Sequence, residues 1–325
     1  MFLRKNILKG ARKYIVFFVL FFCFVSVFYL KDVFFEKFSS TTMREAGSKE
    51  SLMVDGVKRT YWVRVPLGVE KQEVLPLVII LHGAGGNAQS AMESARANGI
   101  ADKNGFIVVY PNGTGVFREY LLSWNAGGCC NYVKPLGVDD VNFIRRLIDK
   151  LKEERNIDSN KIYVAGISNG GMMVYRLGCE LSDKLAAIAA VSSSMLTERC
   201  EPSDFLSVIT FHNLDDRVVP FEGGESDSWI VKLFKLNFNP EKEAVSFWVG
   251  HNFCQGASTK EQEGVVLKET YTECKNNTEV VSYVIEEGGH SWPGGDKTWL
   301  LGGKPANYIV ASEIIWDFFE KHPKK

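Results

Sequence analysis

Short, mostly apolar runs recur along most of the chain and are separated by amphipathic or polar stretches. Runs of this kind, rich in Val, Ile and Ala, are typical of parallel strands that are buried on both faces. We expect strands at 77–81, 106–110, 161–165, 185–191, 207–212 and 280–285. We expect helices between or after them, at 88–104, 138–155, from 171 onwards and at 305–319. This alternation predicts an α/β fold with a mostly parallel central sheet and helices on both faces.

The start of the chain departs from this pattern. Residues 1–13 are basic and contain no acidic residue, and residues 14–30 are uncharged and strongly apolar. A helix over 14–30 is about 25 Å long, close to the ~30 Å hydrocarbon core of a bilayer. Because bulky residues end the apolar segment, we expect an uncleaved transmembrane signal anchor, with a cleaved signal peptide and secretion as the alternative. The basic residues then place the N-terminus in the cytoplasm and the rest of the chain outside it.

A polar linker and one catalytic domain are expected after this anchor. Residues 31–50 are polar and mixed, as in a stalk or linker. We expect the folded domain at 51–325, in an extracellular, periplasmic or lumenal compartment. It opens with a hairpin around Asp55-Gly56, and a strand-like run ends near Tyr271.

The pentapeptide Gly166-Ile167-Ser168-Asn169-Gly170 stands between a predicted strand and a predicted helix. It matches G-x-S-x-G, the nucleophile elbow, in which a serine sits at the tip of a sharp strand–turn–helix. Glycines suit such a turn because neighbours that carry a Cβ collide there. Ser168 is therefore the candidate nucleophile, and an ordinary glycine–serine turn is the alternative.

A second glycine-rich motif, His82-Gly83-Ala84-Gly85-Gly86, follows the strand at 77–81 directly. A loop of this type supplies one backbone amide of the oxyanion hole in α/β hydrolases. We expect the amides of Ala84 and Asn169 to bind the oxyanion, and we expect His82 to be structural. A phosphate-binding loop is disfavoured because the Walker lysine and its spacing are absent.

Two later loops carry the candidate acid and base. Asp215 and Asp216 follow the strand at 207–212. Adjacent carboxylates cannot both point inwards, so only one of them is the acid, and the sequence pattern leaves open which. His290 lies on a glycine-rich loop after the strand at 280–285, from which an imidazole can reach the nucleophile. The chain order of serine, aspartate and histidine predicts the α/β-hydrolase fold.

Composition and charge narrow the range of partners. The 325 residues suffice for one large domain and an appendage. The chain is 46% hydrophobic and 24% charged, and its formal net charge is -1. With no basic stripe in its body, we exclude nucleic acid as a partner. No cysteine or histidine spacing indicates a zinc site, and we expect neither a metal nor an organic cofactor.

Six motifs follow one another at ordinary spacing: HGAGG at 82–86, WNAGGCC at 124–130, VDDVNFI at 138–144, GISNGGMM at 166–173, DDRVVPFEGG at 215–224 and GGHSWPGG at 288–295. Together they resemble the polyhydroxybutyrate depolymerase and feruloyl esterase family of secreted esterases. The resemblance covers about 52–319. It implies that Asp216 rather than Asp215 is the acid, and that Trp124 and Trp292 lie near the substrate groove. Core packing is the alternative for both tryptophans.

Six of the seven cysteines lie in the predicted external domain, and the seventh lies in the apolar segment. An even number in an oxidising compartment predicts three disulfides. Cys254 and Cys274 form the simplest pair. We expect Cys129 and Cys130 to form two further bonds, one with Cys179 and the other with Cys200. The sequence leaves open which cysteine pairs with which.

The sequence thus predicts a serine carboxylic ester hydrolase. His290 takes the proton of Ser168, Asp216 orients His290, and an acyl-enzyme forms and is hydrolysed. The expected substrates are short hydroxyalkanoate, feruloyl or similar small or oligomeric esters. The alternatives are an acyltransferase or a serine peptidase, which share the first half-reaction, and a catalytically silent binding module on the same fold.

Overall fold

The computed structural model describes residues 47–69, 73–115, 119–129, 137–296 and 302–325. The chain divides into two units, Met1–Gly47 and Ser48–Lys325, and every strand and helix described below belongs to the second. Among the described residues, no helix combines the length and the apolar character needed to cross a membrane. The expected anchor at 14–30 lies outside the described residues, as do the basic segment and most of the linker.

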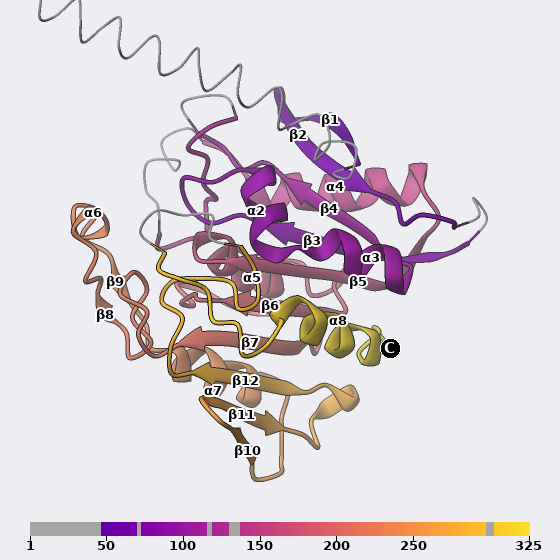
Figure 1. The fold of residues 1–325 in the computed structure, drawn as a ribbon. Helices are drawn as coiled ribbons and strands as arrows, with labels where there is room; N and C mark the ends of the chain where they lie inside the picture. The colour runs from indigo at the N-terminus through magenta and orange to yellow at the C-terminus, as the bar shows by residue number, and fades with distance from the viewer. Residues whose placement is uncertain (1–46, 70–72, 116–118, 130–136, 297–301) are drawn as a thin grey trace, which may run out of the picture. The chain divides into compact units, whose positions relative to one another are not determined.

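A central sheet of ten strands runs through the described part of the second unit, in the order β1-β2-β4-β3-β5-β6-β7-β12-β11-β10 (Figure 1). Its strands are β1 Ser48–Val54, β2 Val57–Arg64, β3 Leu75–Leu81, β4 Ile107–Pro111, β5 Ile157–Ile167, β6 Ala187–Val191, β7 Ser207–Asn213, β10 Thr259–Glu263, β11 Val266–Tyr271 and β12 Val280–Ile285. The strands from β4 to β12 in this order are parallel, and antiparallel strands extend both edges. The predicted α/β class with a mostly parallel sheet is confirmed.

Helices cover both faces of the sheet. The helices are α2 Ala88–Ala95, α3 Ala97–Asn104, α4 Asp140–Glu154, α5 Asn169–Glu180, α7 Glu241–His251 and α8 Ala311–Lys321. In Figure 1, α2, α3 and α8 lie in front of the sheet, and α4, α5 and α7 lie behind it. Strand side chains alternate between the two layers. Val78 and Ile80 of β3 pack in the same apolar cluster as α2, α3 and α8. Leu77 and Ile79 pack in the cluster that contains α4, α5 and α7.

The single helix expected at 88–104 is two helices, because Arg96 between them has a left-handed backbone conformation with a φ of 50°. This break leaves the carbonyl of Ala95 to accept a hydrogen bond from the hydroxyl of Ser312 on α8. The last helix begins at Ala311 rather than at 305. The chain before it is used elsewhere, because the carbonyl of Ala306 accepts a hydrogen bond from the amide of Gly294 on the loop of His290.

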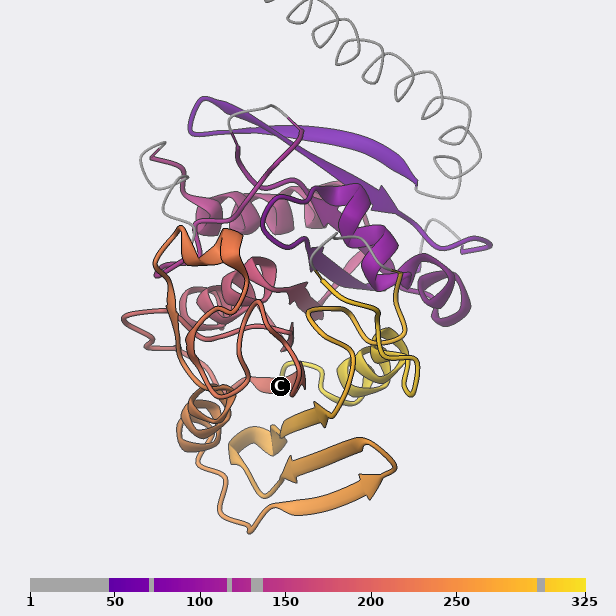
Figure 2. The same ribbon diagram turned by 60° about the vertical axis from the view of Figure 1, so that its left-hand side comes forward.

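An insertion separates β7 from α7 and projects from the sheet (Figures 1 and 2, orange). It contains the short strands β8 Gly224–Glu225 and β9 Asn237–Phe238, with the helical turn α6 Trp229–Lys232 between them. Trp229 is 69% exposed and Leu233 73%. A short 3-10 helix, η2 Lys275–Asn277, links β11 to β12.

Two disulfides join described residues, and one of them differs from the expected pairing. Cys254 bonds to Cys274, as predicted. Cys179 bonds to Cys200, so the expected bonds between this pair and the adjacent cysteines of the WNAGGCC motif are wrong. Cys179 lies in the last turn of α5 and Cys200 in the loop after β6, and their Cα atoms are 4.8 Å apart. Cys129 is disulfide-bonded, and Cys130 lies outside the described residues.

Candidate active site

The serine of the G-x-S-x-G motif stands at a sharp turn, where β5 ends at Ile167 and α5 begins at Asn169. Ser168 has a φ of 57° and a ψ of −126°, a strained conformation for a residue with a side chain. Gly170 explains how the turn fits against β3. A Cβ on Gly170 would lie 2.5 Å from the carbonyl oxygens of Leu81 and His82. The predicted strand, turn and helix are all present.

A serine-rich loop after β6 joins the nucleophile to the candidate base. The amide of Ser168 donates to the carbonyl of Val191 at 2.9 Å, and the hydroxyl of Ser193 donates to the carbonyl of Ser168 at 3.0 Å. Next along the chain, the hydroxyl of Ser192 donates to the carbonyl of Ser291 at 3.0 Å, beside His290. No motif in the sequence predicts a role for these hydroxyls. Their only signal was three consecutive serines directly after a predicted strand.

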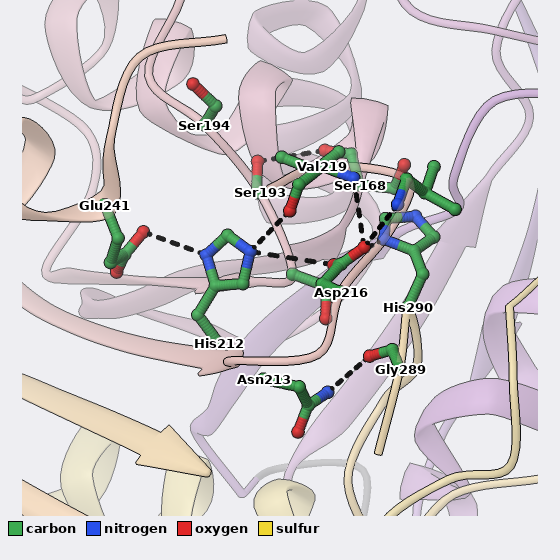
Figure 3. Close-up of polar contacts among 12 residues, drawn as sticks. Ser168, Ser193, Ser194, His212, Asn213, Asp216, Val219, Glu241, Gly289 and His290 are labelled. Carbon is green, nitrogen blue, oxygen red and sulfur yellow. Dashed lines mark hydrogen bonds and ion pairs between the residues drawn. The ribbon is translucent and has the colours of Figure 1, made fainter. Parts of the chain in front are cut away.

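His290 contacts Asp216, and not Asp215, through a short hydrogen bond (Figure 3). His290 Nδ1 lies 2.8 Å from Asp216 Oδ2, and both side chains are buried. The other carboxylate oxygen, Oδ1, accepts hydrogen bonds from the amides of Val218 at 2.8 Å and Val219 at 3.0 Å. Burial alone would raise the pKa of Asp216, but His290 and His212 outweigh it and hold that pKa far below its usual range. The carboxyl group therefore stays ionised.

Asp215, the other candidate acid, holds the loop that carries His290. Its Oδ1 accepts a hydrogen bond from the amide of Gly289 at 2.7 Å. Asn213 Nδ2 donates to the carbonyl of the same glycine at 2.7 Å (Figure 3). Both backbone polar groups of Gly289 are thus fixed by the last residue of β7 and the loop that follows it. The two adjacent carboxylates point in different directions, because Asp215 contacts Gly289 and Asp216 contacts His290.

A second buried histidine lies on the far side of Asp216 from His290 (Figure 3). His212 Nε2 lies 2.9 Å from the carbonyl oxygen of Val219 and 3.6 Å from Asp216 Oδ2, and its Nδ1 lies 3.4 Å from Glu241 Oε2. Burial would lower the pKa of His212, but the hydrogen bonds and charges of the two carboxylates outweigh it and raise this pKa to about 10. In the sequence, His212 ends the predicted strand that precedes the candidate acid, and nothing else marks it. Glu241 lies on a different element and gave no signal.

The HGAGG loop lies directly against the nucleophile. A Cβ on Gly83 would be 3.3 Å from the Cβ of Ser168. In the described part of the chain, no protein group accepts a hydrogen bond from the backbone amide of Ala84 or of Asn169. Both amides expected in the oxyanion hole therefore remain available to donate a hydrogen bond to a substrate.

His82 is buried and neutral, in agreement with a structural role. Its Nε2 accepts a hydrogen bond from the amide of Gly113 at 3.0 Å, so the ring proton lies on Nδ1, which donates to the carbonyl of Gly83 at 2.8 Å. Burial is the main cause that lowers the pKa of His82 to about 4, and the charge of Arg59 adds to it. The ring fixes the glycine loop to the turn after β4.

Trp124 and Trp292 are both core residues. Trp124 is fully buried and its indole nitrogen donates to the carbonyl of His82 at 2.9 Å. Trp292 is 2% exposed and donates to the hydroxyl of Ser312 at 2.9 Å. Core packing describes both rings, and neither reaches the surface expected of a substrate groove. Trp124 acts through the backbone instead, because its amide donates to Asn169 Oδ1 at 2.7 Å.

The described residues contain no group of three or more His, Cys, Asp or Glu side chains with an arrangement that could hold a metal ion. The ionisable side chains of the site contact one another or backbone groups. The arrangement of a serine at a strained turn, a histidine paired with an ionised carboxylate and two open amides is suited to nucleophilic acyl transfer.

Comparisons with known proteins agree with the motifs. The sequence profile of a family described as "Esterase PHB depolymerase" matches residues 59–233, more than half of the chain, and confirms the resemblance inferred from the sequence. Feruloyl esterase B of Piromyces equi is 29% identical over 243 residues, which are 73% of this chain and 43% of the relative. The putative esterase NocK of Nocardia uniformis subsp. tsuyamanensis is 28% identical over 273 residues, 79% of this chain and 75% of the relative. The chain therefore spans less than half the length of the first of these relatives.

Among solved structures, an acetyl xylan esterase from Aspergillus awamori is similar in fold. It superposes with a TM-score of 0.59 at 13% sequence identity and covers 84% of this chain and 99% of its own. Likeness at this identity concerns the fold alone. It supports an α/β-hydrolase-like arrangement of the sheet and helices.

Proposed function

Because the chain belongs to the esterase PHB depolymerase family, we propose that it hydrolyses carboxylic esters with Ser168, His290 and Asp216 as its catalytic triad. The enzyme class predicted from the sequence, a carboxylic ester hydrolase, is confirmed at the level of the family. One observation carries the choice of residues. It is the 2.8 Å contact between His290 and Asp216. The loop that carries His290 is tied to the turn at Ser168 by hydrogen bonds from the adjacent Ser192 and Ser193.

The first half-reaction transfers the acyl group to the serine. His290 Nε2 takes the proton of Ser168 Oγ as this oxygen attacks the ester carbonyl carbon. The amides of Ala84 and Asn169 bind the resulting oxyanion, and each such donor typically contributes ~3 kcal/mol of transition-state stabilisation. The tetrahedral intermediate then expels the alcohol, which takes the proton from His290, and the acyl-enzyme remains.

The second half-reaction repeats these steps with water. His290 removes a proton from a water molecule, whose oxygen attacks the acyl carbonyl, and the carboxylic acid leaves as Ser168 recovers its proton. Asp216 fixes the proton of His290 on Nδ1 and stabilises the imidazolium in both steps. It can do so over a wide pH range because both histidines lower the pKa of Asp216 by more than burial raises it.

We propose short hydroxyalkanoate, feruloyl or similar esters as substrates, since the relatives are named feruloyl esterase and esterase. We also propose the expected division of the chain into a basic segment at 1–13, an anchor at 14–30, a linker at 31–50 and a catalytic domain at 51–325. The two disulfides among described residues support an oxidising, extracellular-type compartment for the domain. β1 begins at Ser48, a few residues before the expected start of the domain.

The test is hydrolysis by the full chain, with and without Ser168→Ala. The esters are p-nitrophenyl acetate, butyrate and octanoate, methyl ferulate and hydroxybutyrate oligomers. We expect turnover that Ser168→Ala abolishes, together with fluorophosphonate labelling of the wild-type chain only. Turnover retained by Ser168→Ala would refute the triad. Labelling without hydrolysis would instead support transfer to another acceptor or peptide hydrolysis, and no labelling of a folded chain would support a silent binding module.

A further inference from the structure

A buried cluster behind Asp216 takes no part in the proton transfers described above. It consists of His212 at the end of β7 and Glu241 in the first turn of α7. His212 is 1% exposed and Glu241 3%. Charged groups are rarely buried unless they are paired. Their position next to the proposed catalytic acid therefore requires an explanation.

Both ring nitrogens of His212 face oxygen atoms. Nε2 faces the carbonyl of Val219 and one oxygen of Asp216, and Nδ1 faces Glu241 (Figure 3). A carbonyl or an ionised carboxylate can only accept a hydrogen bond, so each nitrogen must carry a proton to satisfy its partner. This geometry is that of an imidazolium between two carboxylates.

We propose that His212, held as a cation by Glu241, is a positioning residue that keeps Asp216 ionised and sets the acid limb of the pH–rate profile. The inference rests on the proposed triad, because it assigns His212 a role that acts through Asp216 on His290. Asp216 Oδ2 is the shared atom. It lies 2.8 Å from Nδ1 of His290 and 3.6 Å from Nε2 of His212.

The sharing of one oxygen between two histidines determines the direction of the effect. A carboxylate next to His290 favours the protonated imidazole, which cannot act as a base. The cation at His212 offsets part of that negative charge and so helps His290 to remain free of its proton at lower pH. Glu241 in turn supplies the counter-charge without which a buried cation is costly.

Few other ionisable groups face this cluster in the described structure. Tyr175 of α5 lies close enough to Glu241 for that charge to add to the main effect of burial, which raises the pKa of the tyrosine. His290 faces the cluster only through Asp216. The phenyl ring of Phe221 lies edge-on to His212, with ring centroids 5.5 Å apart, and adds no charge.

The decisive variant is His212→Gln. A glutamine amide can still donate a hydrogen bond towards Val219 or Asp216, but it carries no charge. We expect the acid limb of kcat/KM to move to higher pH by about half a unit to one unit, less than the 1–3 units typical of charges in direct contact. An unmoved limb with a lower kcat would indicate a merely structural role and overturn the proposal.

Glu241→Gln should move the acid limb in the same direction as His212→Gln, by a smaller amount. It removes the counter-charge that holds the cation at His212, so the neutral ring becomes more favourable and offsets less of the charge of Asp216. An upward shift supports the proposal, and an unmoved or downward-shifted limb contradicts it.

His322→Gln is the matched control. His322 is also buried, and its Nε2 also lies 3.4 Å from a glutamate, Glu279, but the pair lies at the end of α8 and contacts no residue of the site. We expect its pH profile to equal that of the wild-type chain.

A measurement on the unaltered chain covers the case in which a variant fails to fold. Nitrogen chemical shifts of the His212 ring distinguish an imidazolium from either neutral tautomer. We expect both ring nitrogens to carry protons at pH 8, and a neutral ring at that pH would overturn the proposal. This result is independent of turnover, whereas activity retained by Ser168→Ala would refute the triad itself.

Discussion

His82 and His212 lie on opposite sides of the candidate nucleophile, and the same burial has opposite consequences for them. His82 directly follows β3, and His212 lies at the end of β7. Neither side chain is more than 1% exposed. Yet the pKa of His82 is lowered to about 4, chiefly by burial, while that of His212 is raised to about 10 by carboxylates that outweigh burial. One ring is therefore neutral at pH 7 and the other is charged.

The partners of the two rings explain the difference. His82 faces a backbone amide and a backbone carbonyl, which one neutral tautomer satisfies completely, and the nearby charge is the cation of Arg59. His212 faces only acceptors, two of which are carboxylates. The HGAGG loop, which carries one of the proposed oxyanion donors, is thus held by a neutral hydrogen-bond network, and the Asp216 side of the site, called the acid side below, is held by a chain of alternating charges.

Asp216→Asn should produce the largest change, because it removes the central anion from the acid side alone. We expect kcat for p-nitrophenyl butyrate to fall by about 10³–10⁴-fold, since an amide can donate to His290 and favour the wrong tautomer. His212 should also lose its proton at lower pH, while the titration of His82 should not change. A loss of less than tenfold would remove Asp216 from the triad.

The same substitution at each histidine should give unequal losses of stability. His212→Phe leaves the carboxylates of Asp216 and Glu241 without a cation, and we expect it to lower the free energy of unfolding by about 3–5 kcal/mol. His82→Phe leaves the amide of Gly113 unpaired and should cost about 1–3 kcal/mol. Urea titrations at pH 7 measure both values. Equal losses would mean that the charges of the acid side add nothing to its stability.

The pH dependence of stability should separate the two rings further. The stability from neutral His82 is fully present above its unfolded pKa of about 6.5 and is lost as the pH falls through 4. That from charged His212 is fully present below about 6.5 and is lost as the pH rises through 10. For His82, the difference between its two pKa values corresponds to about 3 kcal/mol. Unfolding midpoints of both phenylalanine variants from pH 4 to pH 10 test this. His82→Phe should flatten the acid side of the curve and His212→Phe the alkaline side.

Asp215→Ala should have the smallest effect and shows how far the acid side extends. It removes the acceptor of the Gly289 amide, while Asn213 still holds the carbonyl of that glycine. We expect kcat to fall by about 3–10-fold, in line with the loss of one exposed hydrogen bond. Glu222→Ala, which removes another exposed carboxylate from the segment after β7, is the control and should leave kcat unchanged. A loss at Asp215 as large as that at Asp216 would contradict the separate tasks assigned to them.

The parts of the fold and site that the sequence predicted depend on local patterns. Apolar runs identified the central strands, and the elbow at Ser168 was recognisable because a strand, a glycine turn and a helix follow one another directly. The hydrogen bond between His290 and Asp216 agrees with the motif-based choice between two adjacent carboxylates.

The parts that the sequence did not predict depend on contacts between distant segments. The break at Arg96 leaves a carbonyl for Ser312, a residue more than 200 positions away. Pairing of Cys179 with Cys200 depends on where α5 ends relative to the loop after β6. His212 and Glu241 are 29 positions apart, and neither carries a motif that announces the other.

The closeness of Gly170 to β3 limits how this chain could evolve or be engineered. The backbone of α5 lies so close to the carbonyls of Leu81 and His82 that no larger residue fits at Gly170, so the serine turn and the HGAGG loop cannot change position independently. The insertion at 224–238 is under no such constraint, because its tip extends away from the sheet. A mutant library aimed at a new ester preference should therefore vary the insertion and leave the glycines of the elbow untouched.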